Sequence, residues 1–197
     1  MLSPRIAPQM IGLGLIEGIP AAEILLRADP DDAEGDGISG RAQIVMSTHH
    51  GVPMLGRLGL KAGNPTVLDQ SAEAFAGDMG LSNPLRPHPP AAQAACLAAP
   101  VGQEPGIRDG LEVDGPSLDL VAFYARNLAV PERIGVDDSQ VLRGKAMFHD
   151  LGCADCHTPK HVTHRLQDQP EQSFQLIWPY PDLLLHDMSE DLADNRP

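Results

Sequence analysis

The sequence is poor in aromatic residues and in positive charge, and it has no long apolar run. Only 4% of its 197 residues are aromatic, and 14 Lys and Arg stand against 27 Asp and Glu, which gives a formal net charge of −13. Such a chain would repel the phosphates of nucleic acids, so we expect no nucleic-acid partner. No stretch reaches the roughly 18 apolar residues that span a bilayer, so we expect no transmembrane segment.

What the sequence does contain is enough apolar material for a core, divided by many turn-forming residues. Hydrophobic residues make up 42% of the chain, and glycine and proline each occur 19 times. This mixture predicts modest helices, joined by long turn-rich connections and wrapped around a group that fills space. The length suits one domain, or one domain with a partial neighbour.

The first third of the chain predicts one helix and one hairpin. Pro20 can occupy the first turn of a helix that ends before Pro30. Two short apolar segments, residues 44–46 and 54–55, are placed to pair across the turn at residues 49–51.

Three longer helices are predicted further along, over residues 64–80, 117–130 and 139–151, with residues 82–115 as ordered loop. The residues expected to cap these helices are Asn64, Ser117 and either Asp138 or Ser139. The third helix has an apolar face and leads the chain directly to Cys153.

One motif carries chemistry: Cys153-Ala154-Asp155-Cys156-His157. The pattern Cys-x-x-Cys-His is typical of c-type haem attachment. Two thiols separated by two residues reach the two vinyl groups of one porphyrin, and the histidine that follows turns its imidazole under the ring. The sequence therefore predicts a haem bound covalently through Cys153 and Cys156, with His157 as the proximal ligand of the iron.

Other readings of the two cysteines remain open. Together with His161 and His164 they could hold a structural zinc, although the spacing between the two pairs is short for that geometry. A thioredoxin-like disulfide pair lacks the βαβ pattern that normally surrounds it. An inert pair of buried cysteines is the remaining alternative.

The sixth iron ligand decides between electron transfer and peroxide chemistry. Met188 lies 31 positions beyond His157 in the segment His186-Asp187-Met188, and a thioether ligand would favour electron transfer. A methionine in such a place is otherwise a core filler. His186, His161 and His164 are lesser candidates for the same position.

Beyond the motif, most of the chain resembles the bacterial di-haem oxidoreductases often labelled thiol oxidoreductases, which are relatives of the di-haem cytochrome c peroxidases. The segments that carry the likeness are residues 5–20 (RIAPQMIGLGLIEGIP), 35–41 (GDGISGR), 61–66 (KAGNPT), 123–133 (FYARNLAVPER), 143–148 (RGKAMF), 152–157 (GCADCH) and 179–188 (PYPDLLLHDM).

This resemblance implies two haem domains, an export signal and a longer chain. It divides the sequence into a partial N-terminal and inter-haem region, residues 1–115, and a cytochrome c-like haem domain that is incomplete at its C-terminal end, residues 116–197. Of the two attachment sites of the family, only the one at residues 153–157 is present here. A second haem is expected in the full-length protein, and residues 1–20 contain no convincing secretory signal.

The chain departs from the family at two positions. Leu60 stands where the family commonly has a tryptophan, and if that tryptophan relays electrons between haems, the relay is in doubt here. Cys96 resembles one of a family pair whose partner is missing, which makes it a free thiol or a plain buried residue.

An acidic loop at residues 32–37 matches the first half of a calcium-binding loop. Its candidate ligands are Asp32, Glu34 and Asp36, followed by Gly37, but Gln43 stands where a bidentate glutamate should close the site. Peroxidases of this superfamily resemble calcium binders at the domain interface. A solvated turn is the preferred interpretation, with a Ca²⁺ site as the alternative.

Taken together, the sequence predicts a mainly α-helical, c-type cytochrome-like domain with long loops, truncated at both ends. Its expected function is electron transfer through haem c within a periplasmic, di-haem peroxidase-like oxidoreductase. Its partners would be an electron donor or acceptor protein and a small oxidant such as peroxide. With one haem the fragment is expected to turn over weakly or not at all. The alternatives are a non-enzymatic periplasmic electron-carrier or binding domain and, third, a zinc-stabilised interaction module.

Overall fold

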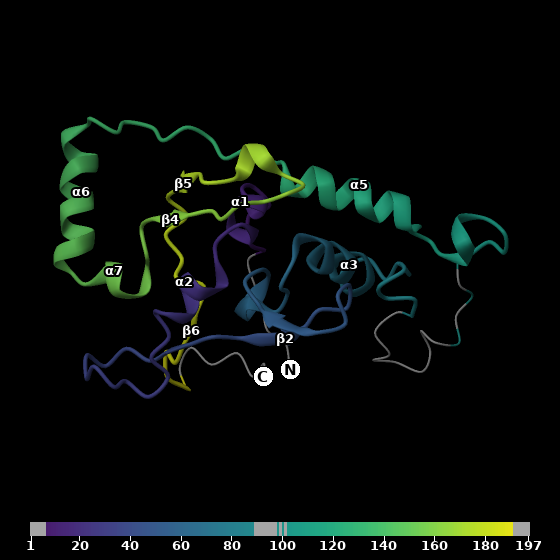
Figure 1. Ribbon diagram of the computed structural model, residues 1–197, viewed down its shortest axis with the longest axis horizontal. Helices are drawn as coiled ribbons and strands as arrows, with labels where there is room; N and C mark the ends of the chain where they lie inside the picture. Colours follow the sequence, from purple (N-terminus) through teal and green to yellow (C-terminus); the bar gives the residue numbers. More distant parts are fainter. Residues whose placement is uncertain (1–6, 89–97, 99, 101, 191–197) are drawn as a thin grey trace.

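The computed structural model describes residues 7–88, 98, 100 and 102–190. In Figure 1, α6 and α7 stand at one end of the molecule, α5 extends towards the other, and the small sheets lie between them. The elements follow in this order: α1 (Leu13–Glu17), α2 (Ala21–Leu25), β1 (Gly40–Arg41), β2 (Ile44–Met46), β3 (Pro53–Leu55), η1 (Leu60–Ala62), α3 (Val67–Gly77), η2 (Arg108–Gly110), α5 (Gly115–Arg126), α6 (Ser139–Asp150), α7 (Cys153–Cys156), β4 (His161–Val162), η3 (Pro170–Gln172), β5 (Leu176–Ile177) and β6 (Leu185–His186).

The prediction of a mainly α-helical, cytochrome-like fold is wrong. Among the described residues, 34% are helical and 10% lie in strands, and the six α-helices are short. The helix expected between Pro20 and Pro30 keeps only Ala21–Leu25, because the chain then tightens into i→i+3 turns at Arg27 and Ala28. Much of the remaining chain runs as long connections that pair only in strands of two or three residues.

The predicted hairpin and the predicted start of the third long helix are confirmed. β2 and β3 are antiparallel, with Ile44 opposite Leu55. α6 begins after Asp138, whose side chain accepts a hydrogen bond from the backbone N–H of Gln140 at 2.7 Å. This bond satisfies one of the amides that the first turn of a helix leaves unpaired.

α3 forms within its predicted range, α5 begins two residues before its predicted range, and both have caps other than the predicted ones. Thr66, rather than Asn64, caps α3 by accepting a hydrogen bond from the backbone N–H of Asp69 at 3.0 Å. Asp114 caps α5 by accepting from the backbone N–H of Ser117 at 2.9 Å, so the predicted cap lies inside the helix. In both helices the cap stands three residues before the amide it binds, which is the usual geometry.

The core consists of three small clusters instead of one. The first joins α1, α3 and α5, the second joins α1, α2, β3 and β5, and the third lies between α3 and α5. Their buried members are Leu13, Leu58, Val67 and Ala125; Ile19, Ile24, Leu55 and Ile177; and Ala72, Val113 and Leu118. All three clusters lie away from α6, which has no buried residue.

The early and late parts of the described chain are interleaved. β1 pairs antiparallel with β6, so that Gly40 lies opposite His186, and the backbone N–H of His164 donates to the carbonyl of Gly18 at 2.8 Å. These contacts bring the segment after the Cys-x-x-Cys-His motif against α1 and α2 (Figure 1). Within the described residues, none of the helices is both long and apolar enough to cross a lipid bilayer.

Candidate functional site

The Cys-x-x-Cys-His motif sits at a sharp turn between two helices. α6 ends at Asp150, and Gly152 then adopts a φ of +74°, a left-handed conformation that glycine accepts without strain. A Cβ atom at this position would lie 2.9 Å from Asp155 Oδ2. The turn starts α7, a single helical turn that holds both cysteines and ends at His157, whose backbone N–H donates to the carbonyl of Cys153 at 2.9 Å.

Both cysteines are unpaired and partly exposed. Cys153 and Cys156 form no disulfide, although they lie in the same helical turn. Burial raises the pKa of Cys156, and the negative charges of Asp182, Asp155 and Asp36 raise it further. The thiol of Cys156 is therefore neutral near pH 7, and it lies close to acidic residues from three separate segments.

His157 is held by ring contacts alone. Its imidazole is exposed and lies 6.3 Å from the ring of Phe148, while Tyr180 meets Phe148 edge to face at 5.4 Å. Arg133 donates to the hydroxyl of Tyr180 at 3.4 Å. Among the described residues, the ring nitrogens of His157 make no hydrogen bond, so they are available to bind iron.

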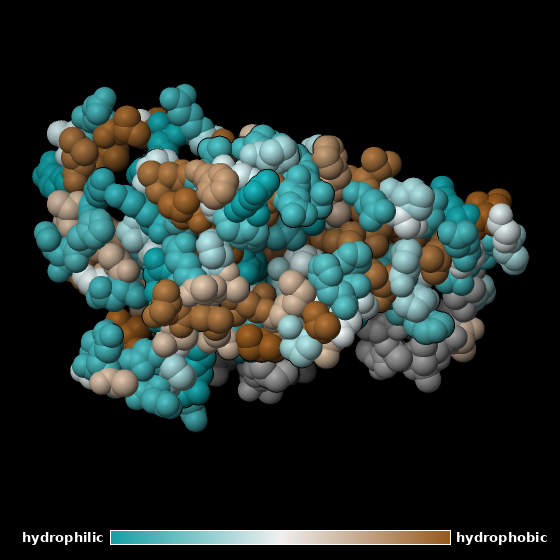
Figure 2. All heavy atoms as spheres, viewed as in Figure 1, coloured by the Kyte–Doolittle hydropathy of each residue, from teal (hydrophilic) through white to brown (hydrophobic). Residues whose placement is uncertain are grey.

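Apart from Phe148, which meets the rings of His157 and Tyr180, the apolar side chains of α6 are uncovered. Three apolar side chains of α6 and that of Leu151, the residue after its end, are between 43% and 72% exposed. The three in the helix are Val141, Leu142 and Met147. Figure 2 shows hydrophobic side chains gathered at this end of the molecule around a hollow, at its upper left. An isolated helix of 12 residues with an uncovered apolar face is marginal in water.

These features together fit a covalently attached haem. Two free thiols at the required spacing, a histidine with unoccupied ring nitrogens and an uncovered apolar helix face are what a porphyrin needs for attachment, ligation and burial. The porphyrin would cover apolar surface that the polypeptide leaves exposed.

Met188, the predicted sixth ligand, lies in the segment after β6. Its side chain is 61% exposed. His186, two residues earlier, is held by a short hydrogen bond between its Nε2 and Asp182 Oδ2 at 2.6 Å, and its Nδ1 is buried without a partner. Sequence reasoning did not find the pairing of Asp182 with His186, although an Asp and a His four residues apart could have suggested it.

The histidines proposed as zinc ligands point elsewhere. His161 is 1% exposed, and its Nδ1 and Nε2 lie 2.9 Å from Glu23 Oε1 and 3.0 Å from the carbonyl of Pro181. His164 Nδ1 lies 2.7 Å from the carbonyl of Arg165. In the part of the chain that the structure describes, no three side chains of His, Cys, Asp or Glu are grouped to hold a metal ion.

The acidic loop uses its carboxylates to hold its own backbone. Asp32 accepts hydrogen bonds from the backbone N–H of Gly37, and Asp36 accepts one from Ile38 at 2.8 Å. Asp29, just before the loop, accepts from the amides of Ala33 and Glu34, and these bonds lower the pKa of Asp29. The loop is therefore a hydrogen-bonded turn. Cys96, the third cysteine, lies outside the described residues.

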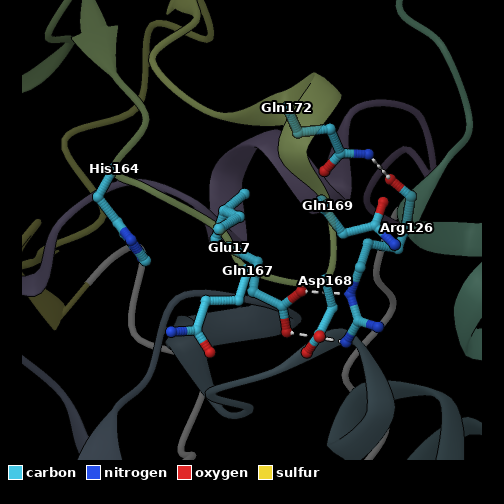
Figure 3. A pocket seen from close by; sticks show the side chains of 9 residues that line it. Glu17, Arg126, His164, Gln167, Asp168, Gln169 and Gln172 are labelled. Carbon is cyan, nitrogen blue, oxygen red and sulfur yellow. Dashed lines mark hydrogen bonds and ion pairs between the residues drawn. The ribbon is translucent and has the colours of Figure 1, made fainter.

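A polar cavity of about 230 Å³ is lined in part by Gly14 and Glu17 of α1. An ion pair between Arg126 and Glu17 forms one wall, with Arg126 Nε 2.6 Å from Glu17 Oε2. Figure 3 shows the side chains that line it: Glu17, Arg126, His164, Leu166, Gln167, Asp168, Gln169 and Gln172, together with Gly14. Sequence reasoning missed this cavity because its two charged partners are 109 residues apart.

Comparison with known proteins gave one match. The family described as "Di-haem oxidoreductase, putative peroxidase" matches residues 1–197. No curated protein and no solved structure matches the chain. The family match covers the motif at residues 153–157 and every other element described above.

Proposed function

The chain belongs to the di-haem oxidoreductase family, and from this membership we propose that it binds one haem c through Cys153 and Cys156 and transfers electrons through it. The observation that carries the proposal is the presence of two unpaired cysteines in one helical turn, followed by the unbonded imidazole of His157. When bound, a haem supplies an iron that gains and loses one electron.

The residues around the motif have distinct tasks in this proposal. Cys153 and Cys156 would hold the porphyrin through their thiols, and His157 would bind its iron. Phe148, packed between His157 and Tyr180, limits the rotation of the imidazole. The exposed apolar side chains of α6 would exclude water from the bound group, and burial is one of the means by which a protein tunes a haem potential.

Met188 is proposed as the sixth ligand. Its thioether is exposed and packed by no core cluster, so it is free to move to the iron. A methionine ligand raises the haem potential and suits a site that transfers electrons. Substitution of Met188 by Ala should then abolish the red absorption band of ferric haem ligated by methionine, and an unchanged band would remove Met188 as the ligand.

The wider setting follows from the family. We propose that residues 116–197 form the haem-bearing domain and that residues 1–115 belong to the region between two haems of a periplasmic enzyme. An electron donor or acceptor protein would dock to it, and a small oxidant such as peroxide would be reduced at the second haem. The chain contains one Cys-x-x-Cys-His motif, so little or no turnover is expected from it alone.

The second candidate function is a non-enzymatic electron carrier. The presence of one Cys-x-x-Cys-His motif in the chain favours it, because a carrier needs one haem. The two functions differ in steady-state peroxide reduction with a ferrocytochrome donor, measured on a full-length clone. Turnover supports the peroxidase-like enzyme, and its absence in full-length, haem-loaded protein supports the carrier.

The haem itself is tested by cysteine substitution. The chain would be co-expressed with the haem-maturation machinery and exported. Its pyridine haemochrome spectrum would then be recorded. Cys153→Ala and Cys156→Ala should each weaken or shift the c-type band, and the double variant should lose it. Cys96→Ala is the matched control and should keep the band. A double variant with the same band as the parent protein would refute the proposal.

A further inference from the structure

The β4–β5 hairpin has one buried face and one exposed apolar face. His161 lies opposite Ile177, and these two side chains are 1% and 9% exposed. Val162 lies opposite Leu176, and these two are 47% and 49% exposed. Opposed residues of an antiparallel pair point to the same face, and successive residues along a strand alternate between faces. Each strand therefore has one side chain in the core and one outside it.

Trp178 continues the exposed face beyond the end of β5. It follows the buried Ile177 directly, and its side chain is 45% exposed. It is the one tryptophan of a chain in which only 4% of the residues are aromatic. Neighbouring apolar side chains that are exposed together usually mark a surface that another group covers. We refer to Val162, Leu176 and Trp178 as the hairpin face.

The buried side of the hairpin packs on α2. Ile177 belongs to the second core cluster together with Ile24, and His161 Nδ1 lies 2.9 Å from Glu23 Oε1. Both Glu23 and Ile24 are residues of α2. The hairpin face is on the opposite side and points away from α2. Within the described residues, no core cluster includes a residue of the hairpin face.

Both ends of the hairpin are tied to the Cys-x-x-Cys-His motif. Val162 comes five residues after His157, so their Cα atoms are at most about 18 Å apart. Tyr180 follows Trp178 by two residues, and its ring meets Phe148 of α6 edge to face at 5.4 Å. The ring of Phe148 in turn lies 6.3 Å from that of His157. The hairpin face therefore lies close to the proposed haem site, and Figure 2 shows hydrophobic side chains on both sides of the hollow at this end of the molecule.

We propose, on the basis of the haem attachment proposed above, that the hairpin face is the second wall of the haem site. Val162, Leu176 and Trp178 pack against the porphyrin, which buries apolar surface that the polypeptide leaves exposed. The uncovered side chains of α6 form the other apolar wall. A second copy of the chain is a poorer occupant, because two chains of net charge −13 repel each other. The haem site is thus built from the segments before and after the motif.

NMR of the haem-loaded protein, in the diamagnetic ferrous state with carbon monoxide bound, tests the contact directly. The ring current of a porphyrin shifts the resonances of nuclei above its plane upfield, and the effect falls steeply with distance. The Val162 methyl signals, assigned by their loss in Val162→Ala, should lie upfield of ordinary valine methyls, and the indole signals of Trp178 should be displaced too. Val52, 49% exposed on the β2–β3 hairpin away from α6 (Figure 1), is the internal reference and should be unshifted.

A matched pair of substitutions tests the surroundings of the haem. Val162→Thr keeps the shape and the strand preference of the residue but adds a hydroxyl group. A polar group beside the porphyrin stabilises the additional positive charge of ferric haem, so the reduction potential should fall. Val52→Thr makes the same change at a similarly exposed position and should leave the potential unchanged. Both variants should keep the c-type band, because neither removes a thiol.

The outcomes separate this proposal from the haem attachment on which it rests. Upfield Val162 methyl signals, together with a lower potential in Val162→Thr than in Val52→Thr, support the second wall. Unshifted Val162 methyl signals, or equal potentials in the two variants, overturn it, while the covalent haem in the same sample leaves the attachment standing. A parent protein that carries no covalent haem overturns both.

Discussion

Arg126 Nε lies 2.6 Å from Glu17 Oε2, and this ion pair joins the start of the chain to the end of α5. Glu17 also accepts a hydrogen bond from the backbone N–H of Val67 at 2.9 Å, at the first turn of α3. One carboxylate thus ties α1, α3 and α5 together. The same three helices surround the first core cluster. The ion pair therefore helps to hold this cluster together.

Arg126→Met should destabilise the fold by about 2 kcal/mol, because it leaves a largely buried carboxylate with one donor. The free energy of unfolding would be measured by denaturant titration. A double-mutant cycle with Glu17→Gln should show coupling between the two positions. Arg143→Met, on the exposed surface of α6, is the control and should change stability by less than about 0.5 kcal/mol. Equal losses in the two arginine variants would contradict the role of the pair.

His161→Phe should cost about 2 kcal/mol or more, since it removes a buried imidazole whose ring nitrogens are hydrogen-bonded to Glu23 Oε1 and to the carbonyl of Pro181. The imidazole is 1% exposed and ties α2 to the segment before β6 through β4. His50→Phe, at the exposed β2–β3 turn, is the comparison. Thermal unfolding of both variants measures the effect. A similar Tm for the two would mean that the hydrogen bonds of His161 do not stabilise the fold.

Asp69 should make stability depend on pH in the acid range. Burial alone would raise the pKa of Asp69, but hydrogen bonds from Thr66, His49, Ser47 and Thr48 outweigh burial and lower it. A carboxyl with a lowered folded pKa contributes stability that is fully present above its unfolded value, near 3.8, and is lost as the pH falls through the lowered value.

The measurement is the free energy of unfolding between pH 7 and pH 2. Asp69→Asn should be less stable than the parent at pH 7, and the difference should shrink as the pH falls below about 4. The control is Asp78→Asn, at an exposed position at the end of the same helix. Its free energy of unfolding should differ from that of the parent by the same amount at every pH. A constant difference across the whole range would show that ionised Asp69 does not stabilise the fold.

α6 should be ordered by the haem and not by the polypeptide. Its apolar face is uncovered and it has no buried residue, so its amides should exchange rapidly in a Cys153→Ala, Cys156→Ala double variant and slowly in haem-loaded protein. α3, which packs in two core clusters, is the internal reference and should be protected in both. Equal protection of α6 with and without haem would contradict the fit of haem to this face.

The local features of the molecule could be predicted from the sequence better than its architecture. The β2–β3 hairpin and the start of α6 depend on neighbouring residues, and both form as expected. α3 and α5 are capped by Thr66 and Asp114 instead of the predicted residues, because the side chain of each lies three residues before a free first-turn amide and accepts from it. The helix after Pro20 is shorter than its apolar pattern suggested, since its last turns tighten near Pro30.

The polar contacts of the candidate site could not be predicted. Glu17 meets Arg126, and Glu23 meets His161 across 138 positions, and no local pattern indicates such partners. The motif at residues 153–157, by contrast, is a local pattern that the sequence alone reveals. What the structure adds is the setting of that motif: a left-handed glycine before it and an uncovered helix face beside it.

The central claim is that a porphyrin is joined covalently to the chain, and acid–acetone extraction tests it most directly. Protein matured with the haem-attachment machinery would be extracted, and the peptide containing residues 153–157 would be analysed by mass spectrometry. The account predicts that the colour stays with the precipitated protein and that this peptide carries the mass of one haem. Colourless protein, or colour that passes entirely into the acetone with an unmodified peptide left behind, would contradict it.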